Sequence, residues 1–254
     1  MSGSWAELFA NMGVVGKALE IIGVNIILSG DNAVVIALAC RGLPPEQRKW
    51  GMILGAGVAV ALRIVFTVVI ASLLGAPYLR IVGALLLFWI AIKLIIEDNE
   101  GKEDEIKASD KLWKAVQTVA IADVVMSLDN VIAIAAVAKD STTLLILGLL
   151  ISIPLIVVGA GLIMSLLSRF PILVWAGAAL LGWVAGEMFL GDPKLLEWLQ
   201  STAPHLVHQV GADQSATGKE AVKWLEYTAA IIGAVFVVAV AYILKKRAPE
   251  GHAA

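Results

Sequence analysis

Apolar residues dominate seven stretches of the chain, each long enough to cross a bilayer as a helix. A spanning helix needs about 20 apolar residues. Such runs lie at 14–39, 51–74, 77–97, 114–138, 142–167, 171–190 and 224–245. The connections between them leave little chain for a soluble domain. We therefore predict an all-α polytopic membrane protein with seven transmembrane helices.

Polar residues interrupt two of these apolar stretches with nearly the same string. Residues 29–32 read Ser-Gly-Asp-Asn, and residues 127–130 read Ser-Leu-Asp-Asn. The two segments align without a gap at an offset of 98, which pairs Asp31 with Asp129. A carboxylate at the centre of a membrane helix costs roughly 2.5–3.5 kcal/mol even on the lenient insertion scale. A repeated string of this kind predicts a functional site.

The similarity between the two halves continues beyond these strings. Further matches, at offsets of 93 and 94, are Ser72-Leu73-Leu74 with Ser165-Leu166-Leu167, Gly83-Ala84 with Gly177-Ala178, and Trp89 with Trp183. The first three spans and the next three therefore look like two copies of one unit. Because three spans is an odd number, the second copy must enter the membrane from the opposite face. Such inverted repeats are typical of secondary transporters, whose site lies near the midplane between the halves.

The repeat divides the chain into five parts. We expect a first three-helix repeat over 1–97, a charged cytoplasmic linker over 98–112 and a second, inverted three-helix repeat over 113–190. An outer loop over 191–221 and a seventh helix with a basic tail over 222–254 complete the chain. The predicted fold is thus a 3+3 inverted repeat plus one C-terminal helix. In the outer loop, closely spaced leucines around Trp198, before Pro204, predict a short interfacial helix.

Basic residues gather in alternate connections between the predicted spans. Most of them belong to the first, third and fifth connections and the C-terminal tail: Arg41, Arg48, Lys49, Lys102, Lys107, Lys111, Arg169, Lys245, Lys246 and Arg247. The positive-inside rule then places the N-terminus outside and the C-terminus in the cytosol. We expect the membrane to be a bacterial cytoplasmic membrane. The first 16 residues lack the basic region and cleavage site of a signal peptide, so no removable leader is expected.

Composition agrees with a membrane protein and narrows the chemistry. Of the 254 residues, 59% are hydrophobic and 16% are charged, which is too apolar for a soluble domain of this length. Cys40 is the single cysteine, which excludes a disulfide framework and a cysteine-based metal site within one chain. We expect no prosthetic group and no nucleic-acid partner. The expected partners are a divalent metal ion and the lipid bilayer, and the oligomeric state stays open.

The oxygen-bearing residues of the two strings predict a cation site. The candidate metal ligands are Asn25, Ser29, Asp31, Asn32, Asp123, Ser127, Asp129 and Asn130. On a regular helix these residues spread over two faces, so local unwinding would let them converge, and Ser29-Gly30 is a place where helices break. Carboxylate, amide and hydroxyl oxygens suit hard cations such as magnesium, calcium and manganese. The alternative is that these residues only join helices by hydrogen bonds.

Four more residues could serve the charge balance or the path of the site. Three aspartates and Arg63 leave two negative charges, which a divalent cation balances, although Arg63 pairing with one aspartate purely for structure is equally open. Met126 could add a sulfur ligand that favours manganese, or be ordinary packing. Glu20 could line the outer part of a path or lie at the surface. Glu187 is harder to explain as a residue that extends to the polar membrane surface, because a glutamate side chain has a shorter reach than a lysine side chain.

The two polar strings resemble those of the TerC family of integral membrane proteins. The resemblance covers about residues 14–245, and the short form without large soluble domains is most similar. It implies seven membrane spans and the export of a divalent cation, chiefly manganese. It also implies that intramembrane acidic residues matter, and these fall on Asp31, Asp123 and Asp129.

Two other functions compete with metal export. An intramembrane aspartyl protease also places two aspartates on separate helices, but its Gly-x-Gly-Asp signature is replaced here by Leu28-Ser29-Gly30-Asp31. A membrane scaffold that delivers metal to partners also fits the resemblance. The leading prediction is a transporter, not an enzyme, that exports Mn²⁺ as its substrate by alternating access. We expect proton counter-transport because protons would replace the charge of the cation in the empty site.

Overall fold

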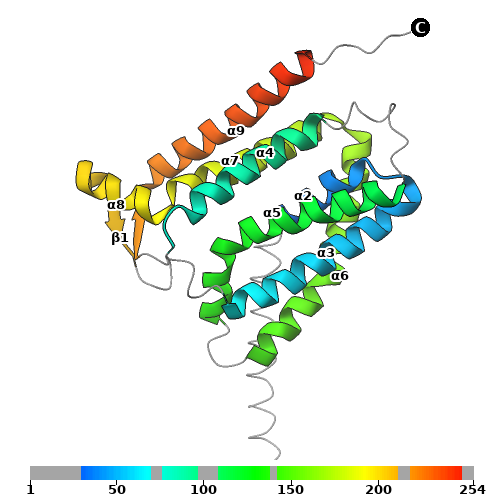
Figure 1. Ribbon diagram of the computed structural model, residues 1–254, viewed down its shortest axis with the longest axis horizontal. Helices are drawn as coiled ribbons and strands as arrows, with labels where there is room; N and C mark the ends of the chain where they lie inside the picture. The colour runs from blue at the N-terminus through cyan, green and yellow to red at the C-terminus, as the bar shows by residue number, and fades with distance from the viewer. Residues whose placement is uncertain (1–29, 70–75, 97–107, 138–141, 211–217, 248–254) are drawn as a thin grey trace, which may run out of the picture.

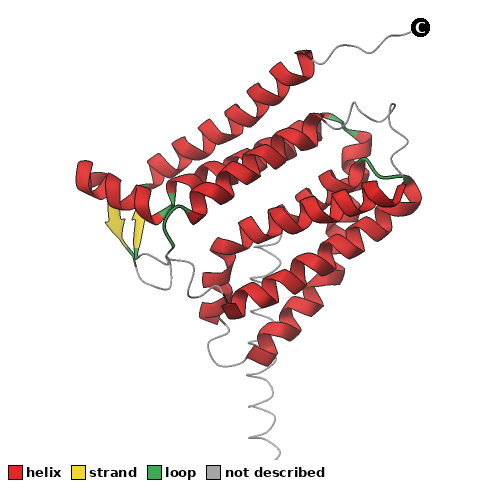
Figure 2. Cartoon of the chain, viewed as in Figure 1, coloured by secondary structure: helices red, strands yellow, loops and turns green. Residues whose placement is uncertain are grey.

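The computed structural model describes most of the chain and shows it to be helical (Figure 2). The described residues are 30–69, 76–96, 108–137, 142–210 and 218–247. Side-chain positions are described for all of these except 66–69, 108–109, 128–137 and 142–152. The predicted linker therefore lies mainly outside the described residues, as does the first half of the first predicted span.

Eight α-helices account for nearly all of the described residues. They are α2 (Gly30–Arg41), α3 (Pro45–Val69), α4 (Leu79–Ile96), α5 (Ala108–Val137), α6 (Thr142–Arg169), α7 (Ile172–Leu190), α8 (Pro193–Thr202) and α9 (Lys223–Arg247). All except α8 coincide with predicted spans, α2 with the second half of the first. Within the described part, α4, α7 and α9 are long and apolar enough to cross a membrane by length and composition. The exact seven-helix 3+3 repeat stays a prediction.

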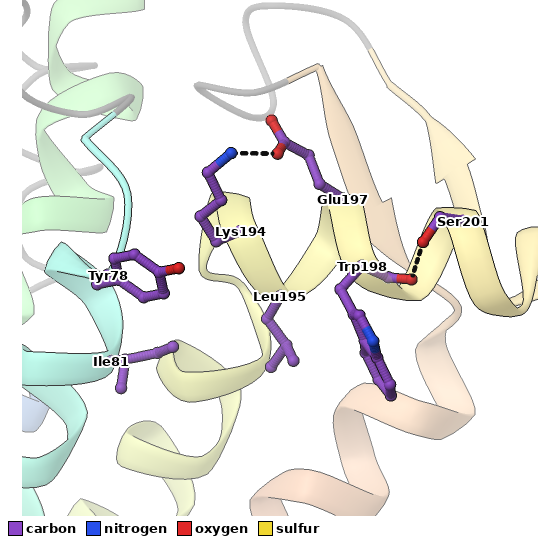
Figure 3. A pocket seen from close by; sticks show the side chains of 7 residues that line it. All are labelled: Tyr78, Ile81, Lys194, Leu195, Glu197, Trp198 and Ser201. Atoms are coloured by element: carbon purple, nitrogen blue, oxygen red, sulfur yellow. Dashed lines mark hydrogen bonds and ion pairs between the residues drawn. The ribbon is translucent and has the colours of Figure 1, made fainter.

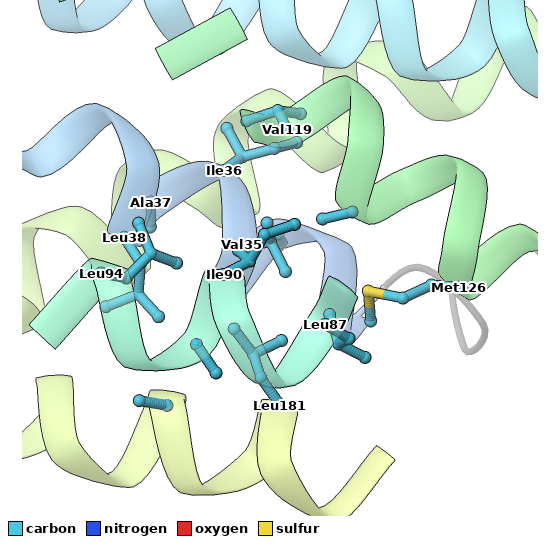
Figure 4. Packing of buried hydrophobic residues seen from close by; sticks show 14 of the residues in the cluster. Val35, Ile36, Ala37, Leu38, Leu87, Ile90, Leu94, Val119, Met126 and Leu181 are labelled. Atoms are coloured by element: carbon cyan, nitrogen blue, oxygen red, sulfur yellow. The ribbon is translucent and has the colours of Figure 1, made fainter. Parts of the chain in front are cut away.

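The helices form two layers that share an apolar core. Figure 1 shows α4, α7 and α9 side by side in one layer, with α2, α3, α5 and α6 in the other. The layers meet where α4 contacts α5 and where α2 contacts α7. Val35 and Ile36 of α2, Leu87 of α4, Val119 of α5 and Leu181 of α7 are buried in the core (Figure 4). Helices of the first predicted repeat therefore pack directly on helices of the second.

Contacts between helices of the two predicted repeats occur in the pairs that a two-fold relation would require. In the predicted repeat, α2, α3 and α4 correspond to α5, α6 and α7. A two-fold relation between the repeats turns the contact of α3 with α5 into a contact of α6 with α2. Both contacts occur. Corresponding helices also touch each other in all three pairs, α2 with α5, α3 with α6 and α4 with α7. This pattern supports the predicted repeat, and α9, which has no counterpart, contacts α7 and α4 from one side.

Glycines allow α7 and α9 to approach each other closely. A Cβ atom added at Gly182 of α7 would lie 2.6 Å from the carbonyl oxygen of Gly233 in α9. At Gly186 an added Cβ would meet the backbone of Ala229 in α9. Small residues at such contacts let helix backbones pack tightly in membrane proteins. The seventh predicted span is therefore fixed to α7 by contact between backbones.

A small hydrogen-bonded segment follows α7. Asp192 caps α8, because its carboxylate accepts hydrogen bonds from the backbone N–H of Lys194 at 3.0 Å and of Tyr78 at 3.3 Å. Strand β1 (Val207–Gln209) pairs antiparallel with β2 (Lys219–Ala221). The predicted short helix is present as α8. The strands were not predicted, because three-residue polar segments show no apolar alternation.

Basic residues lie mainly at one end of the helix layers. Consecutive long helices run in alternate directions, so the starts of α3 and α5 lie at the same end as the last turns of α6 and α9 (Figure 1). That end carries Arg48, Lys49, Lys111, Lys114, Arg169, Lys245, Lys246 and Arg247. Exposed aromatic residues occur at both ends, among them Trp50 and Trp113 at the basic end and Trp198 and Trp224 at the other. Aromatic side chains at two levels are typical of the two membrane interfaces.

Candidate functional site

A buried charged cluster joins α3 to α5. Arg63 of α3 is 1% exposed and Asp123 of α5 is 3% exposed. Arg63 donates a hydrogen bond from Nη2 to Asp123 Oδ1 at 2.5 Å and another from Nε to Ser127 Oγ at 3.1 Å. The Ser127 hydroxyl in turn donates to Asp123 Oδ2 at 3.2 Å. The three side chains therefore close a ring of hydrogen bonds.

The sequence of the two helices explains why this cluster forms. Asp123 and Ser127 are four residues apart on α5, so their side chains lie on one face of the helix. A Cβ atom at Gly55 of α3 would lie 3.3 Å from Val119 Cγ1, so the missing side chain lets α3 approach α5 closely. The approach brings Arg63 within reach of the polar face of α5. A guanidinium group can make two such bonds because its donors are arranged as a planar fork.

Helix α5 remains regular through the second polar string. Residues 127–130 are α-helical, so the local unwinding that would bring all ligands together is not present there. The expected unwinding of the second string is therefore corrected. Asp123 and Ser127 already lie together on a regular helix because they are four residues apart. The other expected break, at Ser29-Gly30, involves Ser29, which lies outside the described residues, and Gly30 belongs to α2.

Asp31 and Asn32 bring the first polar string close to this cluster. Asp31 is half-buried in the first turn of α2, and its Oδ1 atom accepts a hydrogen bond from the Asn32 N–H at 2.8 Å. Asp31 is near enough to interact electrostatically with both Arg63 and Asp123. The Asn32 side chain is buried. Two carboxylates, one from each predicted repeat, and one guanidinium thus gather in one region.

Five of the predicted site residues have no described side chain. Glu20, Asn25 and Ser29 lie outside the described residues. Asp129 and Asn130 belong to α5, but their side chains are not described. Their roles stay predictions. Among the described side chains, no group of three or more histidine, cysteine, aspartate or glutamate residues is close enough to hold a metal ion.

Met126 and Glu187 each have a packing or bonding partner. Met126 is 4% exposed and belongs to the same apolar cluster as Leu87 (Figure 4). Glu187 Oε1 accepts a hydrogen bond from Trp183 Nε1 at 2.8 Å, one turn earlier on α7. The repeat-equivalent pair on α4 is also an intrahelical contact, with Lys93 Nζ 5.1 Å from the ring centroid of Trp89. These contacts favour packing for Met126 and a hydrogen-bonded structural position for Glu187.

A separate open pocket of about 560 Å³ lies between α8 and the start of α4. Its lining residues are Tyr78, Ile81, Lys194, Leu195, Glu197, Trp198 and Ser201 (Figure 3). Lys194 Nζ donates to Glu197 Oε2 at 2.7 Å, which raises the pKa of Lys194 and lowers the pKa of Glu197. Exposed ion pairs of this kind contribute little to stability. No predicted site residue lines this pocket.

Comparison with known families identifies the chain. The integral membrane protein TerC family matches residues 13–249. The chain belongs to the TerC family. This confirms the resemblance carried by the two polar strings and shows that the protein is an integral membrane protein.

Three proteins illustrate the range of similarity to this TerC-family chain. The uncharacterized membrane protein YjbE of Bacillus subtilis is 44% identical over 177 residues, which cover 70% of this chain and 80% of YjbE. YceF of the same organism is 29% identical over 195 residues, covering 72% and 74% of the two chains. The inner membrane protein YoaE of Escherichia coli K12 is 27% identical over 144 residues, covering 50% and 28%. No solved structure matches the chain.

Proposed function

We propose that this TerC-family protein is a transporter, not an enzyme, that exports a divalent cation, above all Mn²⁺, by alternating access. The observation that carries the proposal is the buried cluster of Arg63, Asp123 and Ser127 with Asp31 beside it. Charged side chains inside a membrane protein are costly and mark ion paths and binding sites. This cluster lies where helices of the two predicted repeats meet, which is the usual place for the site of a transporter built from inverted repeats.

The chemistry of the polar strings supports a hard cation as the substrate. Both strings offer carboxylate, amide and hydroxyl oxygens and contain neither histidine nor cysteine. Oxygen ligands of this type suit Mg²⁺, Ca²⁺ and Mn²⁺ better than Zn²⁺ or Cu²⁺. Manganese is proposed first because the resemblance to the TerC family implies it. Asp31 and Asp129, which occupy equivalent places in the two repeats, are the proposed charged ligands, supported by Asn32 and Asn130.

The contacts between repeats support alternating access. Helices α2 and α3 of the first repeat contact α5 and α6 of the second, so a rocking motion of one repeat against the other would alter the surroundings of Asp31 and Asp123 together. Moving two similar halves about a central site exposes that site to each side in turn.

The distribution of basic residues supports one orientation in a bacterial cytoplasmic membrane. The end of the helix layers that holds Lys245–Arg247 also holds Arg48, Lys49 and Arg169. The positive-inside rule places this end in the cytosol. In the proposed orientation the N-terminus lies outside and the C-terminus lies in the cytosol. The inner-membrane names of the E. coli relatives agree with this location.

Manganese flux into liposomes tests the proposal directly. Purified protein in liposomes that contain a Mn²⁺-sensitive dye should transport Mn²⁺, and Asp31→Asn should abolish that flux because it removes a charge while keeping the side-chain shape. Glu197→Gln, which changes the exposed ion pair on α8, is the matched control and should transport normally. Normal flux through a correctly inserted Asp31→Asn protein would overturn the proposal. Tight Mn²⁺ binding with no flux would favour the metal-delivery scaffold.

A further inference from the structure

We infer that the two layers of helices, and not the two predicted repeats, are the bodies that move against each other during transport. The inference rests on the proposed function and deepens it, because it names the moving parts of the proposed alternating access. The layer of α2, α3, α5 and α6 carries the cation, and the layer of α4, α7 and α9 is the scaffold (Figure 1). Each layer contains corresponding helices of both repeats, so each body keeps the two-fold relation.

The charged cluster of the proposed site lies within the four-helix layer. Asp31 and Asn32 belong to α2, Arg63 belongs to α3, and Asp123 and Ser127 belong to α5. Asp31 is close enough to interact electrostatically with Arg63 and Asp123. These five residues therefore share one layer, and a cation bound beside them travels with that layer.

The bonds of Arg63 join the two predicted repeats inside this layer. Arg63 comes from the first repeat and bonds Asp123 and Ser127 of the second, and both charged side chains are almost completely buried. A motion that separated α3 from α5 would have to break these bonds in the interior, where losing a hydrogen bond to a charged group is costly. Gly55 adds a close contact, because a Cβ atom there would lie 3.5 Å from Val119 Cβ. The packing therefore opposes motion between the repeats at this point.

Hydrogen bonds also join the two repeats within the scaffold layer. The backbone N–H of Tyr78 donates to the Asp192 carboxylate at 3.3 Å, and Arg80 Nη1 donates to the carbonyl oxygen of Gly191 at 3.0 Å. These bonds connect the start of α4, in the first predicted repeat, to the end of α7, in the second. The glycine contacts of α7 with α9 add the third helix. The three helices are therefore held together as one body.

Glycines and apolar side chains meet where the layers touch. Gly177 of α7 faces α2, because an added Cβ atom would lie 3.1 Å from both Val34 Cγ1 and Leu38 Cδ1. Gly83 of α4 faces α5, where an added Cβ atom would lie 3.1 Å from Val125 Cγ1. Gly83 and Gly177 are equivalent at the offset of 94, so both repeats make this kind of contact. Sliding at these apolar contacts breaks no bond to a charged group, unlike separation of α3 from α5.

Disulfide cross-links that join either the repeats or the layers test the inference. Every variant carries Cys40→Ala, which removes the single cysteine of the chain. Gly55→Cys/Val119→Cys joins the repeats within the four-helix layer, and its Cβ distance of 3.5 Å suits a disulfide. Gly177→Cys/Val34→Cys joins the two layers. Mn²⁺ flux into liposomes is measured before oxidation, after oxidation and again after reduction.

The two cross-links should have opposite effects on transport. Oxidised Gly55→Cys/Val119→Cys should keep the flux of its reduced form, because α3 and α5 move together. Oxidised Gly177→Cys/Val34→Cys should lose its flux, and reduction should restore it. Loss of flux in the first protein on oxidation, or unchanged flux in the second, would overturn the inference. If the second protein does not fold, the layers can be joined through Gly83 and Val125 instead.

Distances between spin labels separate this inference from the proposed function. If the wild-type protein carries no Mn²⁺, the proposed function fails, yet the moving bodies can still be identified. Val65 of α3, Leu162 of α6 and Val235 of α9 are exposed and can be replaced by labelled cysteines in the Cys40→Ala protein. The measurement is made in lipid at low and high pH, with and without Mg²⁺ as a diamagnetic divalent ion.

The two label pairs give different expected results. The distance from Val65→Cys to Leu162→Cys, between repeats but within one layer, should keep one narrow distribution in all conditions. The distance from Val65→Cys to Val235→Cys, between layers, should shift or split into two populations. A shift in the first pair, or a single unchanging distribution for both pairs, would overturn the inference.

Discussion

Met126 lies one residue before the serine that bonds Asp123 and Arg63, but its side chain points to a different face of α5. It is buried in the apolar cluster that also contains Leu87 and Val125. A flexible thioether commonly fills such irregular gaps between helices. The position therefore explains the residue without a ligand role.

Replacement of Met126 by leucine tests this explanation. Met126→Leu nearly conserves volume, so it should lower the free energy of unfolding by less than about 1.5 kcal/mol. The preference for Mn²⁺ over Mg²⁺ should be unchanged in competition binding, because the substitution removes no proposed ligand. A variant that keeps its Mg²⁺ affinity but loses Mn²⁺ affinity would instead show that the sulfur binds the metal.

Close packing between elements can be tested at two glycines with opposite surroundings. Gly182→Ala should lower the free energy of unfolding by about 1–3 kcal/mol, because its Cβ would press on the backbone of α9. Gly57→Ala in α3 meets nothing within 4 Å and should be neutral or stabilising by up to about 1 kcal/mol. Thermal unfolding in detergent measures both. Equal effects at the two sites would mean that α7 and α9 do not make this contact.

The elements that could be predicted from the sequence are those whose positions follow from hydropathy. Helices α3 to α7 and α9 lie on the predicted spans, because a chain in a bilayer must satisfy its backbone hydrogen bonds within each helix. The spacing of apolar residues also indicated α8. The strands β1 and β2 could not be predicted, because each has only three residues and is defined by its pairing with the other strand.

The partner of Arg63 was beyond sequence reasoning for a similar reason. The sequence offers Asp31, Asp123 and Asp129 as possible ion-pair partners of Arg63. The packing of α3 on α5 shows that Asp123 is bonded to it. The sequence predicts local unwinding because a regular helix spreads the candidate ligands over two faces. The structure shows that Asp123 and Ser127 bond Arg63 from a regular helix, which removes that need for these two residues.

At the scale of the whole molecule, the charge count predicts how transport is driven. Asp31, Asp123 and Asp129 together with Arg63 amount to two net negative charges, which a departing divalent cation would leave unbalanced. Returning these charges unprotonated through a closed intermediate would bury them in a low dielectric, which is heavily unfavourable. We therefore predict that about two protons enter for each cation exported, since one proton neutralises each unit of net negative charge in the interior.

Liposomes with an imposed pH gradient provide the measurement. A pH gradient alone should concentrate Mn²⁺ against its own gradient, and Mn²⁺ flux should acidify the compartment that the metal leaves. Asp31→Asn should abolish both signals. Flux that carries net charge and ignores the pH gradient would identify a uniporter or channel and contradict proton coupling.

The glycine contact between α7 and α9 has a consequence for how the protein is made in the cell. Helix α9 leaves the ribosome after α7, so until then it cannot cover Gly182 and Gly186 of α7. A chain that ends before Lys223 keeps this backbone surface uncovered, and quality-control proteases of the membrane can recognise it as incomplete. Such a truncated chain should have a shorter lifetime in pulse-chase experiments, and the separately expressed α9 segment should restore it.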